Sequence, residues 1–190
     1  MEMLKFLTLV GKLKRTKRSG WVANGIKDPE SVSDHMYRMS IMALVLNDSS
    51  GKLNRDHCIK LSLVHDLAEC IVGDITPHDN VPQEEKHRRE VGAMQHLGTL
   101  VDMDVAKELH DLFMEYENQD TPESRFVKDL DRFDMVLQAH HYEEEVNDHK
   151  KLEEFFQSVK GKFTTDVVKD LFEKLSENRN LKQCPRENSL

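Results

Sequence analysis

An adjacent histidine and aspartate, His65 and Asp66, are the residues of this chain whose types and setting most strongly favour chemistry. They stand in the segment Leu-Val-His-Asp-Leu-Ala-Glu, where the apolar neighbours predict a buried helix. Burying an imidazole and a carboxylate among apolar side chains is costly unless the groups are paired, hydrogen-bonded or bound to a cation. The pair therefore indicates a site that holds a metal ion.

Two further residues, His35 and Asp131, lie in other predicted helices and complete a candidate set of four metal ligands. Two neutral imidazoles and two carboxylates balance the charge of one divalent cation, and the lack of a thiolate argues against a structural zinc site. Each residue alone has an ordinary explanation, since Asp131 has Lys128 and Arg132 as possible ion-pair partners. The four residues together, on apolar helices, favour a metal-dependent hydrolase.

The predicted helix that carries the pair spans residues 58–68 and is apolar on nearly all sides, which marks it as central. On such a helix His65 and Glu69 share a face, whereas Asp66 is turned by about 100° from His65. One ion can therefore bind both His65 and Asp66 only at that edge of the helix. Gly73 breaks the pattern and predicts a turn directly after it.

Helical periodicity dominates the remaining sequence, and few stretches alternate in hydrophobicity as strands do. Ser31 and Asp34 resemble an N-terminal cap, and Thr121-Pro122 is a helix start with proline at the first position. The sequence therefore predicts an all-α protein. Apolar stripes place the other helices near residues 3–13, 34–47, 94–101, 105–116, 122–137, 152–159 and 168–175.

Length and composition narrow the classes of function. A length of 190 residues predicts one domain over residues 1–178 with a polar C-terminal tail over residues 179–190. The net charge of −8 argues against an extended nucleic-acid surface but still admits a small anionic substrate beside a metal ion. Three cysteines without paired spacing are typical of reduced thiols in an intracellular protein.

The N-terminal apolar stretch is interrupted by Lys5 and Lys12, so it is too broken for a signal peptide and too short to span a bilayer. We therefore expect a cytoplasmic protein that does not bind membranes. The basic residues between positions 12 and 18 leave an organellar presequence open as an alternative.

Four stretches of the chain together resemble the HD-domain superfamily of metal-dependent phosphohydrolases, whose signature is H…HD…D. They are Glu30–His35, Leu63–Ile75, Glu84–Glu90 and Phe126–Asp131. The pattern Val-His-Asp-x-x-Glu-x-x-x-Gly-Asp makes the chain most similar to the HD-domain 5′-deoxynucleotidases. This resemblance implies a single-domain HD-domain helical bundle, a divalent metal cation such as Mn, Co or Mg, and a homodimer. The implied reaction is hydrolysis of 2′-deoxyribonucleoside 5′-monophosphates to deoxynucleoside and phosphate.

Roles for individual residues also follow from the resemblance. It implies the metal ligands His35, His65, Asp66 and Asp131, the catalytic acids Glu69 and Asp74, and a substrate-contacting turn of Asp74, Ile75, Thr76 and Pro77. We expect Glu69 to accept the proton of the attacking water, and Asp74 to orient that water or protonate the leaving 5′-oxygen. In the alternative, Glu69, Asp74 and the Ile75 carbonyl hold a second, weaker ion such as Mg.

The family's sugar-contacting tryptophan corresponds to Trp21. A flat ring against the sugar would leave no room for a 2′-hydroxyl. An anchoring tryptophan in a half-buried loop explains the residue equally well. Bacterial members place the phosphate-orienting arginine directly before this tryptophan, where this chain has Gly20, so Arg18 is the candidate phosphate anchor.

Two other functions are compatible with the sequence. An HD-type phosphodiesterase would act on a cyclic or signalling nucleotide, although nothing around the remaining histidines resembles the motifs of its binuclear members. A non-catalytic, metal-bound helical module would act by binding partners, although it would not need both Glu69 and Asp74.

Overall fold

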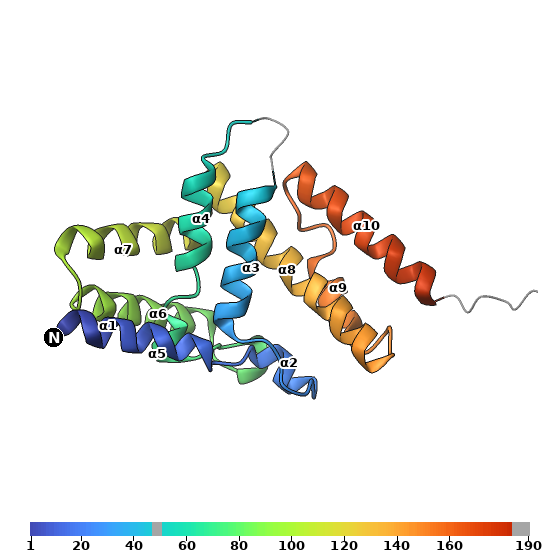
Figure 1. Ribbon diagram of the computed structural model, residues 1–190, viewed down its shortest axis with the longest axis horizontal. Coiled ribbons are helices and arrows are strands. Elements are labelled where there is room, and N and C mark those ends of the chain that lie inside the picture. Colours follow the sequence, from blue (N-terminus) through green and yellow to red (C-terminus); the bar gives the residue numbers. More distant parts are fainter. Residues whose placement is uncertain (47–50, 184–190) are drawn as a thin grey trace, which may run out of the picture.

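The computed structural model describes residues 1–46 and 51–183, which form α-helices and two short 3-10 helices without any named β-strand (Figure 1). The prediction of an all-α protein is confirmed. The elements are α1 (Glu2–Val10), η1 (Gly11–Lys14), α2 (Ser19–Ala23), α3 (Val32–Val45), α4 (Arg55–Val64), α5 (Glu69–Val72), η2 (Pro77–Asp79), α6 (Gln83–Gly98), α7 (Met103–Asn118), α8 (Pro122–Val146), α9 (Glu153–Val159) and α10 (Asp166–Gln183).

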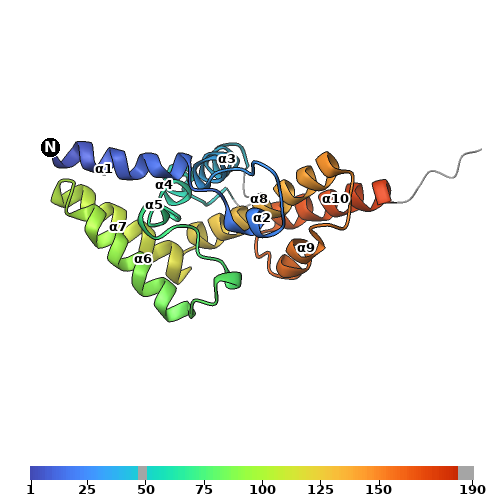
Figure 2. The same ribbon diagram turned by 90° about the horizontal axis from the view of Figure 1, so that it is seen from below.

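Three helices, α3, α4 and α8, pack against one another in the middle of the molecule. Their contact buries Met39, Leu61 and Leu130 completely, because the apolar faces predicted from the sequence meet there. Figure 2 shows α1, α6 and α7 at one end and α9 and α10 at the other, with α8 running between the two ends. The long α8, at 25 residues, is therefore the element that joins both halves.

Side-chain caps set where the two helices that carry His35 and Asp131 begin. Ser31 accepts from the backbone N–H of Asp34, and the Asp34 carboxylate accepts from the Ser31 N–H, so α3 starts with the predicted capping box. Thr121 caps α8, and Pro122 occupies its first turn, as expected. These caps place His35 in the first turn of α3.

The predicted helix over residues 58–68 does not continue through the His65-Asp66 pair, and that prediction was wrong. α4 ends at Val64, and the next hydrogen bonds span only three residues, from Leu67 N to the Val64 carbonyl and from Glu69 N to the Asp66 carbonyl. The Nδ1–H of the His65 ring donates to the Ser62 carbonyl. In a continuing helix that carbonyl would accept from a backbone N–H instead. The pair consequently lies in a tight turn between α4 and α5.

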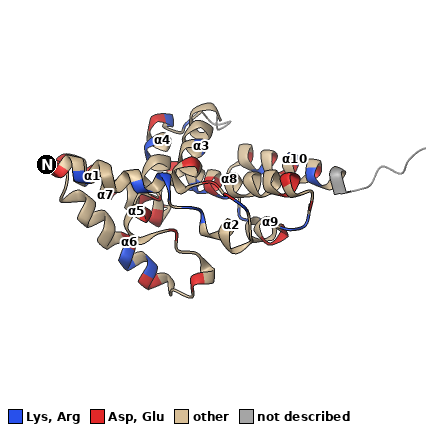
Figure 3. Cartoon of the chain, turned by 60° about the horizontal axis from the view of Figure 1, so that its bottom comes forward, with Lys and Arg blue, Asp and Glu red and all other residues tan. Residues whose placement is uncertain are grey.

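Charged residues follow one another along the first part of α6 (Figure 3). Glu85 pairs with both Arg88 and Arg89, so the run over residues 84–90 is largely an exposed face of ion pairs. No helix within the described ranges is both long and apolar enough to cross a bilayer.

At the C-terminal end, α10 continues to Gln183, past the boundary predicted after residue 178. Arg179 is only 5% exposed and donates to the fully buried Glu143 at 2.7 and 2.9 Å. The same guanidinium donates to Glu153 at 2.7 Å and lies 4.0 Å from the centre of the Phe156 ring. Residues 184–190 of the predicted tail lie outside the described residues, and the division at 178 stays a prediction.

We expect Arg179→Met to lower the free energy of unfolding by about 3 kcal/mol, because it leaves the Glu143 carboxylate buried without its charge partner. Chemical denaturation measures the change. Lys174→Met is the matched control, since Lys174 forms an exposed ion pair on the same helix and its loss is expected to have no measurable effect. Equal stabilities of the two variants would contradict a structural role for Arg179.

Candidate metal centre and catalytic cavity

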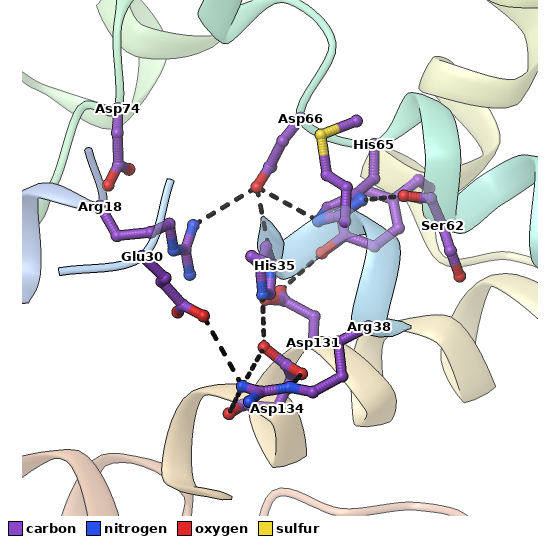
Figure 4. A network of polar contacts seen from close by, with 12 residues as sticks. Arg18, Glu30, His35, Arg38, Ser62, His65, Asp66, Asp74, Asp131 and Asp134 are labelled. Carbon is purple, nitrogen blue, oxygen red and sulfur yellow. Dashed lines mark hydrogen bonds and ion pairs between the residues drawn. The ribbon is translucent and has the colours of Figure 1, made fainter. Parts of the chain in front are cut away.

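Side chains from α3, from the turn after α4 and from α8 meet at one point (Figure 4). His35 Nε2 lies 3.8 Å from Asp66 Oδ2 and 3.4 Å from Asp131 Oδ1. His65 Nε2 lies 3.2 Å from the same Asp66 oxygen. Metal–ligand bonds of about 2.0–2.2 Å place neighbouring donor atoms about 3 Å apart. His35, His65 and Asp66 are thus brought together at spacings that suit one ion, and Asp131 joins them through its contact with His35.

Both imidazoles present the same nitrogen to this point. His35 Nδ1 lies 2.7 Å from Asp134 Oδ2, and His65 Nδ1 lies 2.9 Å from the Ser62 carbonyl oxygen. A carbonyl or carboxylate oxygen can only accept, so each Nδ1 carries the hydrogen. Each Nε2 is buried and has no hydrogen-bond partner among the described residues. In their neutral forms, both rings therefore turn a nitrogen lone pair toward the point where the carboxylates meet.

Asp131 is oriented by two donors that the sequence analysis did not assign to the site. Tyr116 Oη donates to Oδ2 at 2.7 Å, and Lys128 Nζ donates to the same oxygen at 2.9 Å. This arrangement leaves Oδ1 facing His35. The ion pair between Asp131 and Lys128, considered above as an alternative to metal binding, occurs together with the ligand geometry.

The charges of the neighbours keep both carboxylates ionised. Burial acts to raise the pKa of Asp66, but the nearby His65 and Arg18 outweigh it and lower that pKa. Burial likewise opposes ionisation of Asp131, and the charge of Lys128 contributes most to holding its pKa well below the usual range. The meeting point therefore carries two negative charges.

The protonation of His35 shows how strongly this point attracts positive charge. Burial and the charge of Arg18 act to lower the pKa of His35, but the carboxylates of Asp131 and Asp134 raise it to about 9. A divalent cation would supply that positive charge at Nε2 in place of a proton. The buried nitrogens of His35 and His65 and the carboxylate of Asp66 lie close enough together to hold such a cation, and the Asp131 carboxylate, which contacts His35, is the candidate fourth ligand.

A second cluster of acids and histidine, made by Glu30, His35 and Asp134, lies on the other side of the His35 ring. The guanidinium of Arg38 already provides positive charge there, because it donates to Asp134 and lies 3.7 Å from Glu30. This cluster is therefore an ion-pair network rather than a second metal site.

A cavity of about 460 Å³ opens beside the centre, within the size range of small-ligand sites. One part of its wall is charged and includes the cationic side chains Arg18, Lys86 and Lys128. Another part is apolar and comes from Trp21, Met135 and Phe155. The cavity thus combines these cationic side chains with acidic ones, Asp66, Glu69 and Asp74 among them, and has an apolar surface beside them.

Glu69 and Asp74 lie on the cavity wall as expected. Glu69 is 4% exposed, and its Oε2 has no hydrogen-bond partner within the described part of the chain. Burial, followed by the charges of Asp66 and Asp74, raises its pKa well above the usual range. Asp74 is fixed, because its Oδ2 accepts from the Ser19 N–H at 2.6 Å at the start of α2.

The turn predicted to contact substrate also lines the cavity, through Ile75, Thr76 and Pro77. Thr76 is tied to Asp79, whose carboxylate accepts from both its N–H and its hydroxyl. The Ile75 carbonyl accepts from Lys86 Nζ at 3.0 Å. Since a cationic side chain holds that oxygen, the geometry does not favour the second-ion alternative.

Arg18 points into the site, with Nη1 at 3.4 Å from Asp66 Oδ2 (Figure 4). A side chain at Gly20 would instead meet Phe155, because a Cβ atom there would lie 3.4 Å from its ring. Trp21 lies in α2 and not in the half-buried loop that was predicted. It is 2% exposed, donates to Glu30 at 3.0 Å and packs on Phe155, so it anchors α2 and presents little surface to the cavity.

Several residues of the site were not predicted from the sequence. Lys128 and Asp134 stand three residues before and three after Asp131, a spacing that puts all three near one side of α8 and would have been a usable signal. Tyr116 and Phe155 carry no such signal, because their place depends on how α7 and α9 pack.

The chain is similar to known proteins over most of its length. A family model described as HD domain matches residues 10–175. The chain is 55% identical over 177 residues to the 5′-deoxynucleotidase HDDC2 of Danio rerio, covering 93% of this chain and 88% of that protein. It is 46% identical over 159 residues to the 5′-deoxynucleotidase hdd1 of Schizosaccharomyces pombe, covering 82% and 79%. Among solved structures, the PH0347 protein from Pyrococcus horikoshii OT3 matches with a TM-score of 0.74 and 31% identity, covering 94% and 99%.

We expect Mn²⁺ to raise the melting temperature of the protein, because an ion bound only by the folded state stabilises it. At a free concentration 100 times Kd the gain is about 2.7 kcal/mol, or about 5–10 °C for a domain of this size. Asp131→Asn should lose most of this shift in scanning calorimetry, whereas Asp111→Asn, an exposed acid on α7, should retain it. An unchanged shift in Asp131→Asn would remove Asp131 from the ligand set.

Proposed function

This chain belongs to the HD domain family, and from that premise we propose that the centre and its cavity form the active site of a metal-dependent 5′-deoxynucleotidase. The substrate class is 2′-deoxyribonucleoside 5′-monophosphates, and the products are deoxynucleoside and phosphate. The observation that carries the proposal is the convergence of two buried nitrogen lone pairs and two carboxylates beside a cavity that also holds Glu69.

Hydrolysis of a phosphate monoester has a very high barrier, and the dianionic phosphate repels an attacking hydroxide. His35, His65, Asp66 and Asp131 would hold a divalent cation, which would neutralise phosphate charge and make water more acidic. The chain itself contributes Arg18, whose guanidinium reaches the edge of this centre. We assign Arg18 to binding a phosphate oxygen, a task that its fixed fork of donors suits.

Glu69 has the environment of a general base. Burial and the charges of Asp66 and Asp74 raise its pKa, which makes its carboxylate a stronger base toward water. Asp74 shares the cavity but is held by the start of α2, which suits a residue that orients water or the leaving 5′-oxygen. Both roles are part of the proposal.

We propose that the edge of Trp21 limits the space beside the sugar, which would disfavour a 2′-hydroxyl. The homodimer and the cytoplasmic location also stay predictions. The stripe of Leu152, Phe155 and Phe156 does not supply a dimer surface, because Leu152 and Phe156 are buried within the chain and Phe155 lines the cavity.

The first test is a panel of dAMP, AMP and cyclic AMP, each assayed with Mn²⁺, Co²⁺ and Mg²⁺. We expect phosphate release from dAMP with a kcat/KM at least about tenfold above that for AMP, and no opening of cyclic AMP. Trp21→Phe should lower the dAMP-to-AMP ratio. Tyr142→Phe, which keeps the ring that packs on Trp21 and removes only a hydroxyl that accepts from the Glu30 N–H, should not. Opening of cyclic AMP would favour a phosphodiesterase, and no turnover with any metal would favour a binding module.

Glu69→Gln preserves the shape of the side chain but removes its ability to accept a proton. We expect kcat to fall by about 10²–10⁴-fold, while the affinity for the tightly held ion stays close to that of the wild type. Steady-state kinetics and a metal titration measure the two quantities. Glu84→Gln, on the exposed side of α6, is the control, and full turnover by Glu69→Gln would exclude Glu69 as the base.

A further inference from the structure

We propose that Asp134, held in place by Arg38, is a positioning residue that sets the tautomer and the ring orientation of His35 at the metal centre. The inference rests on the proposed metal centre but not on the identity of the substrate. It assigns a task to a buried acid that none of the roles above uses.

The contact between the side chains of His35 and Asp134 is short and shielded from solvent. His35 Nδ1 on α3 and Asp134 Oδ2 on α8 lie 2.7 Å apart, and both side chains are completely buried. Both oxygens of Asp134 also face the guanidinium of Arg38, which can only donate. The carboxylate therefore accepts from its neighbours, so Nδ1 of His35 donates and Nε2 keeps the lone pair when the ring is neutral.

Arg38 prevents the Asp134 carboxylate from turning. Its Nε donates to Oδ1 and its Nη2 donates to Oδ2 at 3.0 Å, which is a fork-to-fork arrangement. The guanidinium is itself held, because Nη1 donates to Gln138 Oε1 at 2.6 Å and Nη2 to the Asp134 carbonyl at 3.2 Å. The plane of the carboxylate, and with it the direction of the His35 ring, is therefore fixed from both helices.

The two histidines of the centre differ in how they are held. His65 Nδ1 donates to a backbone carbonyl, that of Ser62, which no substitution removes. His35 depends on the side chain of Asp134 for the same task. The orientation of one ligand can thus be disturbed by a single substitution that touches neither the metal position nor the cavity.

A purely structural role is the competing explanation, since a buried ion pair between Arg38 and Asp134 also fastens α3 to α8. Asp129 is a matched control for that explanation. It is likewise fully buried on α8, and its Oδ2 accepts from the backbone N–H groups of Thr164 and Thr165 at 2.7 Å, away from the centre. Its substitution removes a buried carboxylate without touching His35.

Asp134→Asn conflicts with the network in either orientation of the amide. If the amide nitrogen faces His35, it donates, and the ring is driven to carry its hydrogen on Nε2, where it cannot bind a metal. If the amide oxygen faces His35, the amide nitrogen faces the donors of Arg38. We expect the Kd for Mn²⁺ to rise by about 10–100-fold in Asp134→Asn and to stay near the wild-type value in Asp129→Asn.

Isothermal titration of each full-length variant with Mn²⁺ gives the Kd, and the visible spectrum of the Co²⁺-loaded protein reports the ligand geometry. A changed Co²⁺ spectrum in Asp134→Asn but not in Asp129→Asn supports positioning. An unchanged Kd and spectrum, or equal weakening in both variants, overturns it. If Asp134→Asn does not fold, Arg38→Lys decides, because loss of the fork should still raise the Kd, and an unchanged Kd overturns the proposal. Failure of the nucleotide panel with normal Mn²⁺ binding would refute the proposed function alone.

Discussion

Two buried nitrogen lone pairs, on Nε2 of His35 and Nε2 of His65, are the constraint on which the rest of this structure depends. A buried polar atom without a partner destabilises a fold, so a protein keeps two of them side by side only when something else occupies the space between them. The carboxylates of Asp66 and Asp131 complete that space. The helices that meet there are held so that these four side chains keep pointing toward that space.

The long helix α8 contributes most to holding these four side chains in place. Asp131 and Asp134 are three residues apart on it, so one carboxylate reaches the centre while the other reaches the far nitrogen of the same histidine. The capping box of α3 fixes where that helix begins, and so where His35 lies along it. The tight turn after α4 places His65 and Asp66 so that both face the centre. The metal centre is therefore a product of helix ends and helix packing.

How much could be predicted from the sequence follows from these same features. The caps at Ser31 and Thr121 could be predicted from local side-chain chemistry. The residues that meet at the centre could be predicted because their chemistry and a resemblance both indicated them. The end of α4 could not be predicted, because it depends on the His65 side chain donating to the Ser62 carbonyl within an apolar segment. The helix past residue 178 was missed for a similar reason, because Arg179 looks like a surface residue until Glu143 is placed beneath it.

Glu69 stands apart from the ligands because nothing in the fold requires it. Its carboxylate is almost completely buried, and one oxygen has no hydrogen-bond partner among the described residues. That burial, followed by the charges of Asp66 and Asp74, raises its pKa. A leucine there would satisfy the packing without that destabilisation. Local conflicts of this kind concentrate where a protein does chemistry. The same burial that weakens the fold makes the carboxylate a stronger base, which is the property that attack of water on a phosphate monoester requires.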